Sequence, residues 1–174
     1  MVLSVLQRIE NLLKPLDAIV RLLLIICFLG MVSAVFAQVF YRYVLKSPIP
    51  WAEELARFLF AWVTFLGASV AAKQKAHTGV ELFISFLPKT LQRIVALATY
   101  LICMVFVMLV GGYGFLLAAN TTTQHSPALH LPMSIPYAAV PLGSLLMLVY
   151  FIYLFIEELE NMQRDINQEE ALQG

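Results

Sequence analysis

Four long stretches of almost uninterrupted apolar residues dominate the chain. They run from about Leu22 to Leu45, Glu53 to Ala72, Ile94 to Ala119 and Ser134 to Ile156. A helix needs about 20 mostly apolar residues to cross a bilayer, and each stretch is long enough. Unpaired backbone groups are costly in hydrocarbon, so we expect helices here and not open strands. The pattern predicts an all-α integral membrane protein with four transmembrane helices.

Two further segments have apolar residues at three- and four-residue steps, which is typical of helices that lie along a membrane surface. The first has its apolar positions at Leu3, Leu6, Ile9, Leu13, Leu16 and Val20. The second covers residues 80–87. We expect amphipathic interfacial helices near the N-terminus and between helices 2 and 3. The alternative is that each segment extends a neighbouring spanning helix.

Composition supports a membrane protein, because 61% of the 174 residues are hydrophobic and 13% are charged. Soluble domains have roughly 45–50% apolar and about 25% charged residues. The length suits one domain, which we assign to residues 1–174. Net charge is zero, so composition indicates no nucleic-acid partner. The N-terminal segment lacks the pattern of a cleaved signal peptide, so the first span is expected to remain in the protein.

Lysine and arginine positions predict the orientation. One side of a four-span protein holds both termini and the loop between helices 2 and 3. Its basic residues are Arg8, Lys14, Arg21, Lys73, Lys75, Lys89, Arg93 and Arg164, against Arg42, Lys46 and Arg57 on the other side. The richer side should be cytoplasmic. We therefore expect a multi-pass membrane protein with both termini in the cytoplasm.

The junction of the first two spans gathers several charged residues. Pro48 and Pro50 should force a short extended turn. Beyond Trp51, an aromatic residue typical of membrane interfaces, the junction has charged side chains at Arg42, Glu53, Glu54 and Arg57, with Gln38 one turn before Arg42. Their charges sum to zero. We expect an ion-pair cluster that fixes these helix ends, with a partner-subunit contact or substrate handling as alternatives.

No pattern in the sequence indicates catalysis or a cofactor. The histidines, His77, His125 and His130, lie in or near loops, whereas haem in a four-helix membrane cytochrome needs histidines inside the spans. Two histidines of one loop would lack the further ligands of a usual metal site. We expect no catalytic, cofactor-binding or metal-binding residues, and therefore no enzyme.

Two segments resemble the small membrane subunits of tripartite ATP-independent periplasmic (TRAP) transporters. The first is PWAEELARFLFAWVTFLGASVAAKQKAHTGVELF, in which the matching positions are Pro50, Trp51, Glu53, Glu54, Arg57, Trp62, Gly67, His77, Val80, Glu81 and Leu82. The second is SPALHLPMSIPYAAVPLG, with Ser126, Pro127, Leu131, Pro132, Pro136, Tyr137, Pro141 and Gly143. Glu81 departs from the aspartate that is more usual there.

The resemblance implies a function as part of a larger transporter. In that family a periplasmic binding protein delivers an organic anion, such as a C4-dicarboxylate or sialic acid, to two membrane subunits. The large subunit holds the substrate and sodium sites and moves like an elevator, whereas the small one anchors a static scaffold. The implied partners are the large subunit, the binding protein (transiently) and lipids. The resemblance also implies a location in the bacterial inner membrane, and it makes the matching positions above candidates for structural or subunit contacts.

Two other functions are compatible with four apolar helices. One is the anchor subunit of a membrane redox complex, against which the absence of histidines in the spans argues. The other is a small self-sufficient transporter that works as an oligomer. Such a transporter normally needs an acidic residue inside the membrane, and Glu53 and Glu54 are too near the surface for that role.

Overall fold

The computed structural model describes residues 2–74 and 89–173, and the side chains of residues 13–74 and 91–163. Most of the described residues lie in the long helices α1 (Val2–Tyr43), α2 (Pro50–Lys73), α4 (Lys89–Asn120) and α6 (Ala139–Gln173). The one-turn helix α5 (Ser134–Tyr137) directly precedes α6. Each long helix contains a segment that is long and apolar enough to cross a membrane. The predicted four-helix architecture is confirmed.

The helices extend beyond the apolar stretches that the sequence pattern marks. Helix α1 has 42 residues and is continuous through Pro15, so the predicted N-terminal interfacial segment forms its first turns. At 1.5 Å per residue this helix is about 63 Å long, roughly twice the thickness of a bilayer core. The position of those first turns at a membrane surface stays a prediction. The second predicted interfacial helix, residues 80–87, lies outside the described residues.

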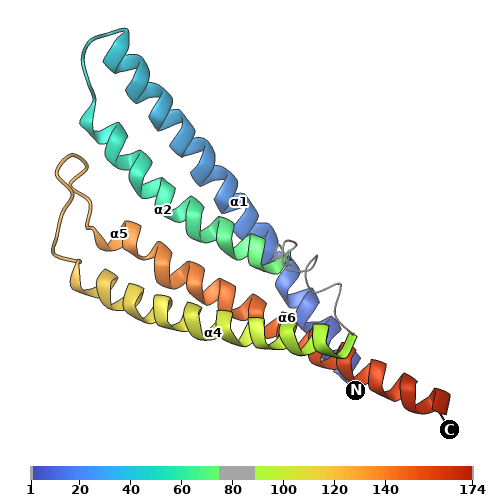
Figure 1. Cartoon of the computed structure of the whole chain (residues 1–174). Coiled ribbons are helices and arrows are strands. Elements are labelled where there is room, and N and C mark those ends of the chain that lie inside the picture. Colours follow the sequence, from blue (N-terminus) through green and yellow to red (C-terminus); the bar gives the residue numbers. More distant parts are fainter. Residues whose placement is uncertain (1, 75–88, 174) are drawn as a thin grey trace.

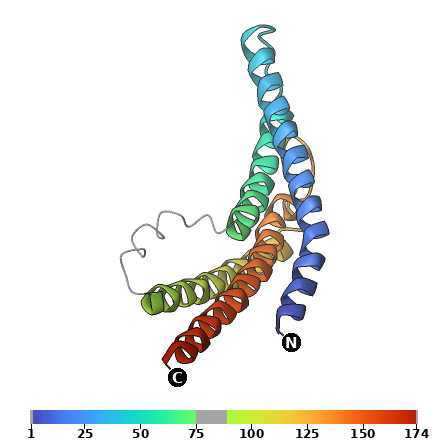
Figure 2. The same ribbon diagram turned by 90° about the vertical axis from the view of Figure 1, so that its right-hand side faces the viewer.

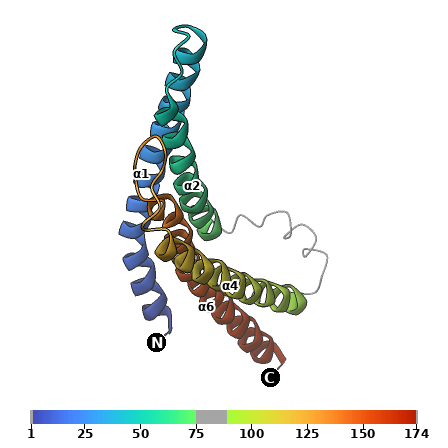
Figure 3. The same cartoon turned by 90° about the vertical axis from the view of Figure 1, so that its left-hand side faces the viewer.

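The chain forms two helical hairpins, α1 with α2 and α4 with α6 (Figure 1). Helices α2 and α6 pack against each other and join the hairpins. The beginning of α1 and the end of α6 lie at one end of the molecule, which we call the termini end (Figure 1). The turn at 44–49 and the loop at 121–133 lie at the opposite end, the loop end. Side views show the hairpins inclined to each other (Figures 2 and 3).

Close contact between α2 and α6 depends on a glycine. A Cβ atom added at Gly143 would lie 2.6 Å from Cβ of Phe65 and 3.1 Å from the Phe65 backbone. Real Cβ atoms essentially never approach a neighbour this closely, so only glycine fits. The hairpins are therefore joined backbone to backbone.

The proline turn between α1 and α2 has the expected form. Ile49 has extended backbone angles (φ −109°, ψ 101°), and α2 begins at Pro50. Proline suits the first helical position because its missing N–H group would have no partner there anyway. The prediction of a short extended turn at the prolines is confirmed. This turn places the end of α1 beside the first turns of α2.

Candidate functional site

A long uncharged band separates two groups of polar residues. The sequence has no Asp, Glu, Lys or Arg at positions 22–41, 58–72 and 94–156. In α2, Lys73 lies 16 residues after Arg57, which is about 24 Å along the helix axis. This is close to the thickness of a hydrocarbon core, once long side chains reach outward to water. The candidate functional sites are the polar groups at the two ends of this band.

At the loop end, Glu53 is the centre of an ion-pair cluster. Its carboxylate lies 3.5 Å from Nη2 of Arg57, one helical turn later, and 3.8 Å from Nη2 of Arg42 on α1. The Gln38 side-chain amide also donates a hydrogen bond of 3.2 Å to Glu53. The three charged side chains are substantially exposed, 72% in the case of Arg57. Pairs this exposed contribute at most about 1 kcal/mol each in water.

Glu54 has a different environment from its neighbour. It is buried, with 6% of its surface exposed. Its Oε2 atom accepts hydrogen bonds from the backbone N–H groups of Ala128 (3.0 Å) and Leu129 (2.8 Å). Hydrogen bonds to a charged acceptor are stronger than neutral ones, and their loss would leave a buried charge without partners. Glu54 therefore fastens the 121–133 loop to the start of α2, across 75 residues of sequence.

The loop that Glu54 holds has an ordered backbone of its own. Ser126 is almost fully buried, and its N–H and C=O groups bond to Leu131 (2.9 Å) and His130 (3.1 Å). The N–H of Leu131 also donates to the Ser126 hydroxyl at 3.3 Å. His130 has φ 54°, in the left-handed region that allows the sharp turn. These bonds turn the two N–H groups at the tip of the loop toward α2.

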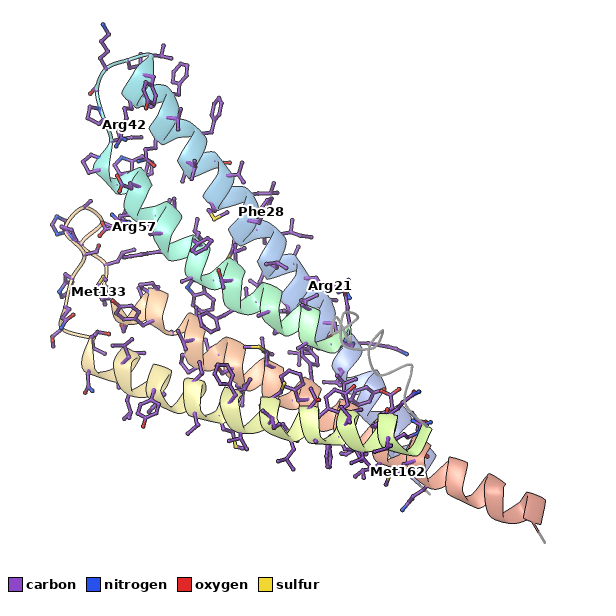
Figure 4. The ribbon with its side chains drawn as sticks, in the orientation of Figure 1. Arg21, Phe28, Arg42, Arg57, Met133 and Met162 are labelled. Carbon is purple, nitrogen blue, oxygen red and sulfur yellow. The ribbon has the colours of Figure 1, made fainter. Side chains whose placement is uncertain are left out.

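A shallow cleft of about 400 Å³ lies between this loop and the first turns of α2. Its lining consists of Pro50, Trp51, Glu53, Glu54, Arg57, Pro127 and Ala128. Figure 4 places Arg57 on the side of α2 that faces the loop containing Met133. The cleft combines an exposed guanidinium, an exposed indole and proline rings. Such a surface suits reversible contact with another protein, because arginine and tryptophan are enriched in the energetically important parts of interfaces.

At the termini end, a second polar cluster joins three helices. Lys73 at the end of α2 forms an ion pair with Asp17 on α1. Tyr150 on α6 donates a hydrogen bond of 2.6 Å to the same carboxylate, and Lys73 Nζ lies 5.9 Å from the centre of the Tyr150 ring. Only 14% of the Asp17 side chain is exposed. We call Asp17, Lys73 and Tyr150 the termini-end cluster.

A nearby ion pair ties the second hairpin together at the same end. Arg93 Nη1 on α4 lies 2.8 Å from Oε1 of Glu158 on α6, and both side chains are mostly buried. The spacing of 65 residues makes this a contact between helices that are distant in sequence. Each neighbouring pair of helices at the termini end is thus joined by at least one charged group.

The remaining predicted site residues lie along the helices. Trp62 and Gly67 are half-buried on α2, and a Cβ at Gly67 would meet Leu24 of α1 at an ordinary 3.9 Å. Pro141 is half-buried near the start of α6, beside α4, and Gly143 contacts α2. His77 lies outside the described residues. The structure thus brings Gln38, Arg42, Glu53 and Arg57 together. Glu54 does not belong to this cluster, because it is buried and bonds to the 121–133 loop.

Sequence reasoning did not find the termini-end cluster. Asp17 was hidden in a segment interpreted as amphipathic, and Tyr150 lies within an aromatic run that is indistinguishable from lipid-facing sequence. The available signal was one acidic residue on α1 and one lysine on α2, both just beyond the uncharged band on the same predicted side. Two residues of opposite charge at the same end of a helical hairpin are candidates for an ion pair, and this reasoning would have suggested the contact.

Hydroxyl groups inside the uncharged band are mostly bonded to their own helices. Thr64 donates to the Phe60 carbonyl at 2.8 Å, Ser69 to Leu66 at 2.7 Å and Thr99 to Val95 at 2.8 Å. The hydrogen of each of these hydroxyls is therefore used in a bond within its own helix. Transporter ion sites at the membrane midplane are typically built from broken helices and free carbonyls. The described helices α2 and α4 are unbroken across the band.

The sequence matches a known family over most of its length. Residues 31–161 match the family model described as "Tripartite ATP-independent periplasmic transporters, DctQ component". The matched region includes the ion-pair cluster around Glu53 at the loop end, the 121–133 loop and most of α6. It excludes Asp17, the α1 member of the termini-end cluster.

Three relatives illustrate the range of similar proteins. A Haemophilus influenzae chain named as a TRAP transporter small permease protein is 33% identical, over 82% of this chain and 85% of the relative. The C4-dicarboxylate TRAP transporter small permease protein DctQ of Vibrio cholerae is 30% identical, over 75% and 67%. The sialic acid TRAP transporter permease protein SiaT of Haemophilus influenzae is 26% identical over 72% of this chain, but over only 20% of the relative.

The two neighbouring glutamates should respond differently to substitution. We expect Glu54→Ala to lower the free energy of unfolding by about 3 kcal/mol, because two backbone N–H groups lose a charged acceptor. Glu53→Ala should cost less than about 1 kcal/mol, since its pairs are exposed. Thermal unfolding in detergent, with hydrogen exchange at Ala128 and Leu129, measures both effects. Equal losses in the two variants would contradict the assigned role of Glu54.

Variants of the termini-end cluster should lose stability by different amounts. Tyr150→Phe removes one hydrogen bond to a carboxylate and should cost about 2 kcal/mol. Lys73→Met should cost more, about 3 kcal/mol, because Asp17 keeps a largely buried charge without its cation. Adding Asp17→Leu to Lys73→Met should recover part of the loss. Denaturant unfolding of the four proteins tests the order, and a double variant less stable than Lys73→Met would refute it.

Proposed function

The chain belongs to the family of DctQ components of tripartite ATP-independent periplasmic transporters, and we propose that it is the static scaffold subunit of such a transporter. The observation that carries this proposal is the uncharged band, crossed by the unbroken helices α2 and α4, in which the Thr64, Ser69 and Thr99 hydroxyls donate to their own helices. A chain built this way braces other helices and does not itself bind the transported solute. All residues of the chain belong, in this proposal, to one membrane domain.

The main partner in this proposal is a large membrane subunit. The matched part of SiaT is about a fifth of that permease, so a DctQ-like segment also occurs within one much longer chain. Many large apolar side chains on α1 and α4 are exposed, among them Phe36 (71%) and Phe106 (63%). In a membrane these faces contact lipid or the helices of the partner. The large subunit would hold the moving parts and the sodium sites, and this chain the fixed frame.

The transported solute is proposed to be an organic anion. The relatives' names include a C4-dicarboxylate transporter and a sialic acid transporter, and both solutes are carboxylates. We propose import driven by the sodium gradient, with solute and sodium bound by the large subunit. The choice between solutes then belongs to the other two proteins of the transporter.

The loop end is proposed to face the periplasm. The basic residues are concentrated at the other end of the chain, which favours a cytoplasmic location of the termini in the inner membrane. The cleft beside Trp51 and Arg57 would then be open to the periplasm. We propose that this surface touches the substrate-binding protein transiently. Its exposed arginine can form hydrogen bonds to a carboxylate of that protein, and a single exposed contact of this kind allows the complex to dissociate readily.

Cysteine labelling tests this orientation. In a chain without Cys27 and Cys103, we expect Thr123→Cys in the exposed loop to react with a membrane-impermeant maleimide added to spheroplasts. Gln163→Cys, exposed near the far end of the described α6 side chains, is the matched control and should react only after the membrane is permeabilised. The reverse pattern would place the loop end in the cytoplasm.

Purification under mild conditions tests the scaffold function. The tagged chain, extracted in mild detergent from its own membranes, should retain one much larger membrane protein in about equal amount. Liposomes that contain this chain alone should not take up C4-dicarboxylate or sialic acid in a sodium gradient, and liposomes with both subunits and the binding protein should. Uptake by the chain alone would favour a self-sufficient transporter. A bound haem or quinone would favour a redox anchor.

A further inference from the structure

Among the described residues, one buried hydroxyl group within the uncharged band has no hydrogen-bond partner. The Ser144 side chain on α6 is 2% exposed, and its Oγ atom is buried. By contrast, Thr64, Ser69 and Thr99 each donate to a carbonyl of the preceding turn. A buried polar group without a partner is costly, and more so in a membrane, where water cannot replace the missing bond. Ser144 is therefore a position at which the isolated chain is incomplete.

Ser144 lines a groove of about 190 Å³ between α4 and α6. The other lining residues include Met108, Gly111 and Gly112 on α4, and Pro141 and Leu145 on α6. Met108 and Leu145 are more than half exposed, so the groove opens on the outer surface of the second hairpin. Its walls are apolar apart from the serine. The groove lies within the uncharged band and so at membrane depth.

Two of the three glycines on α4 are already used within the chain. A Cβ at Gly111 would lie 3.0 Å from Cβ of Ser144, and one at Gly114 would lie 2.5 Å from Val140. These glycines let α6 approach α4 closely. At Gly112, an added Cβ would meet nothing within 4 Å. Glycine inside a helix is less stable than alanine, so nothing within the described fold accounts for it there.

We propose that a spanning helix of the large membrane subunit packs into this groove, with its backbone over Gly112 and a hydrogen-bonding group against Ser144. Small residues allow helices in membranes to approach closely, and serine side chains bond across such contacts. A lipid acyl chain would fill the apolar groove but leave the hydroxyl unpaired. Rotation about χ1 moves Oγ between staggered positions, so Ser144 can turn toward an arriving partner.

The inference rests on the proposed function, because it needs a large subunit, and it adds the face of the chain that this subunit contacts. It also gives Ser144 and Gly112 a common explanation. Each is unfavourable or unnecessary in the chain alone, and each is favoured by a closely packed neighbouring helix. The occupant must be polar at one point and apolar elsewhere, which describes a transmembrane helix with one hydrogen-bonding side chain.

Two substitutions separate binding from folding. In Gly112→Leu the new Cβ would meet no neighbour within 4 Å, and leucine favours a helix more than glycine does. The chain alone should therefore unfold at the wild-type temperature or above. Ser144→Ala removes an unpaired buried hydroxyl and should likewise leave the chain alone at least as stable as before. We expect Gly112→Leu to lower the affinity for the copurifying large subunit by about tenfold. Ser144→Ala should lower it by about threefold, the size of one interhelical hydrogen bond.

Leu117→Trp is the matched control on α4. Leu117 is 46% exposed and lies five residues after Gly112, about 140° further round the helix. It adds bulk to the same helix on a different face and should leave the affinity unchanged. Equal loss in all three variants would overturn the inference, because the groove would then have no special role.

The remaining outcomes separate this inference from the proposed function. If the wild-type chain retains no large subunit, both fail together. If wild type and both groove variants retain it equally, only the inference fails. Loss of a copurifying phospholipid from Gly112→Leu, detected by native mass spectrometry with the large subunit still bound, would assign the groove to a lipid and overturn it. Loss of self-association alone would assign the groove to a second copy and also overturn it.

Discussion

The cost of placing charge in hydrocarbon governs where every strong polar contact of this protein is found. Charged side chains are absent from positions 22–41, 58–72 and 94–156, so ion pairs can form only at the two ends of the helices. Between these ends the helices are held mainly by packing, because lipid gives no hydrophobic driving force for helices to associate. The glycine at the α2–α6 contact, Gly143, follows from this. Van der Waals contact must be close where no other attraction is available.

Contacts at three heights along the bundle fix the two hairpins relative to each other. Glu54 ties α2 to the 121–133 loop at one end, and Asp17 joins α1, α2 and α6 at the other. Between them, Gly143 brings α6 against the backbone of α2. Rotation of one hairpin against the other would break at least one of these contacts. This arrangement suits the proposed scaffold function, because a scaffold subunit needs hairpins that keep a fixed position relative to each other.

The helices could be predicted from sequence because their signal is local. Apolar runs longer than 20 residues have one structural solution in a bilayer, and the prolines at 48 and 50 mark the turn. The approach of Arg42, Glu53 and Arg57 follows from helix periodicity and a short connection. The bonds of Glu54 could not be predicted in this way. Its partners are backbone N–H groups about 75 residues away, which have no side-chain signature, and its exposed neighbour has the same residue type.

The glycines of α4 also show that contacts between distant parts of the chain cannot be predicted from the local sequence. A patch of three on α4 indicates close approach by some helix, but the sequence does not say whether that helix belongs to the same chain. In the fold, Gly111 and Gly114 are occupied by α6, whereas Gly112 faces open space. In SiaT the matching segment is part of one longer permease, and a face of that segment would contact the rest of the permease. A position that is costly in the isolated chain and open at its surface is where such a contact would be maintained. Gly112 meets both conditions, and Ser144 meets the first and lines the same groove. The exposed leucines and phenylalanines of α1 and α4 are not costly in this way, since lipid alone satisfies them.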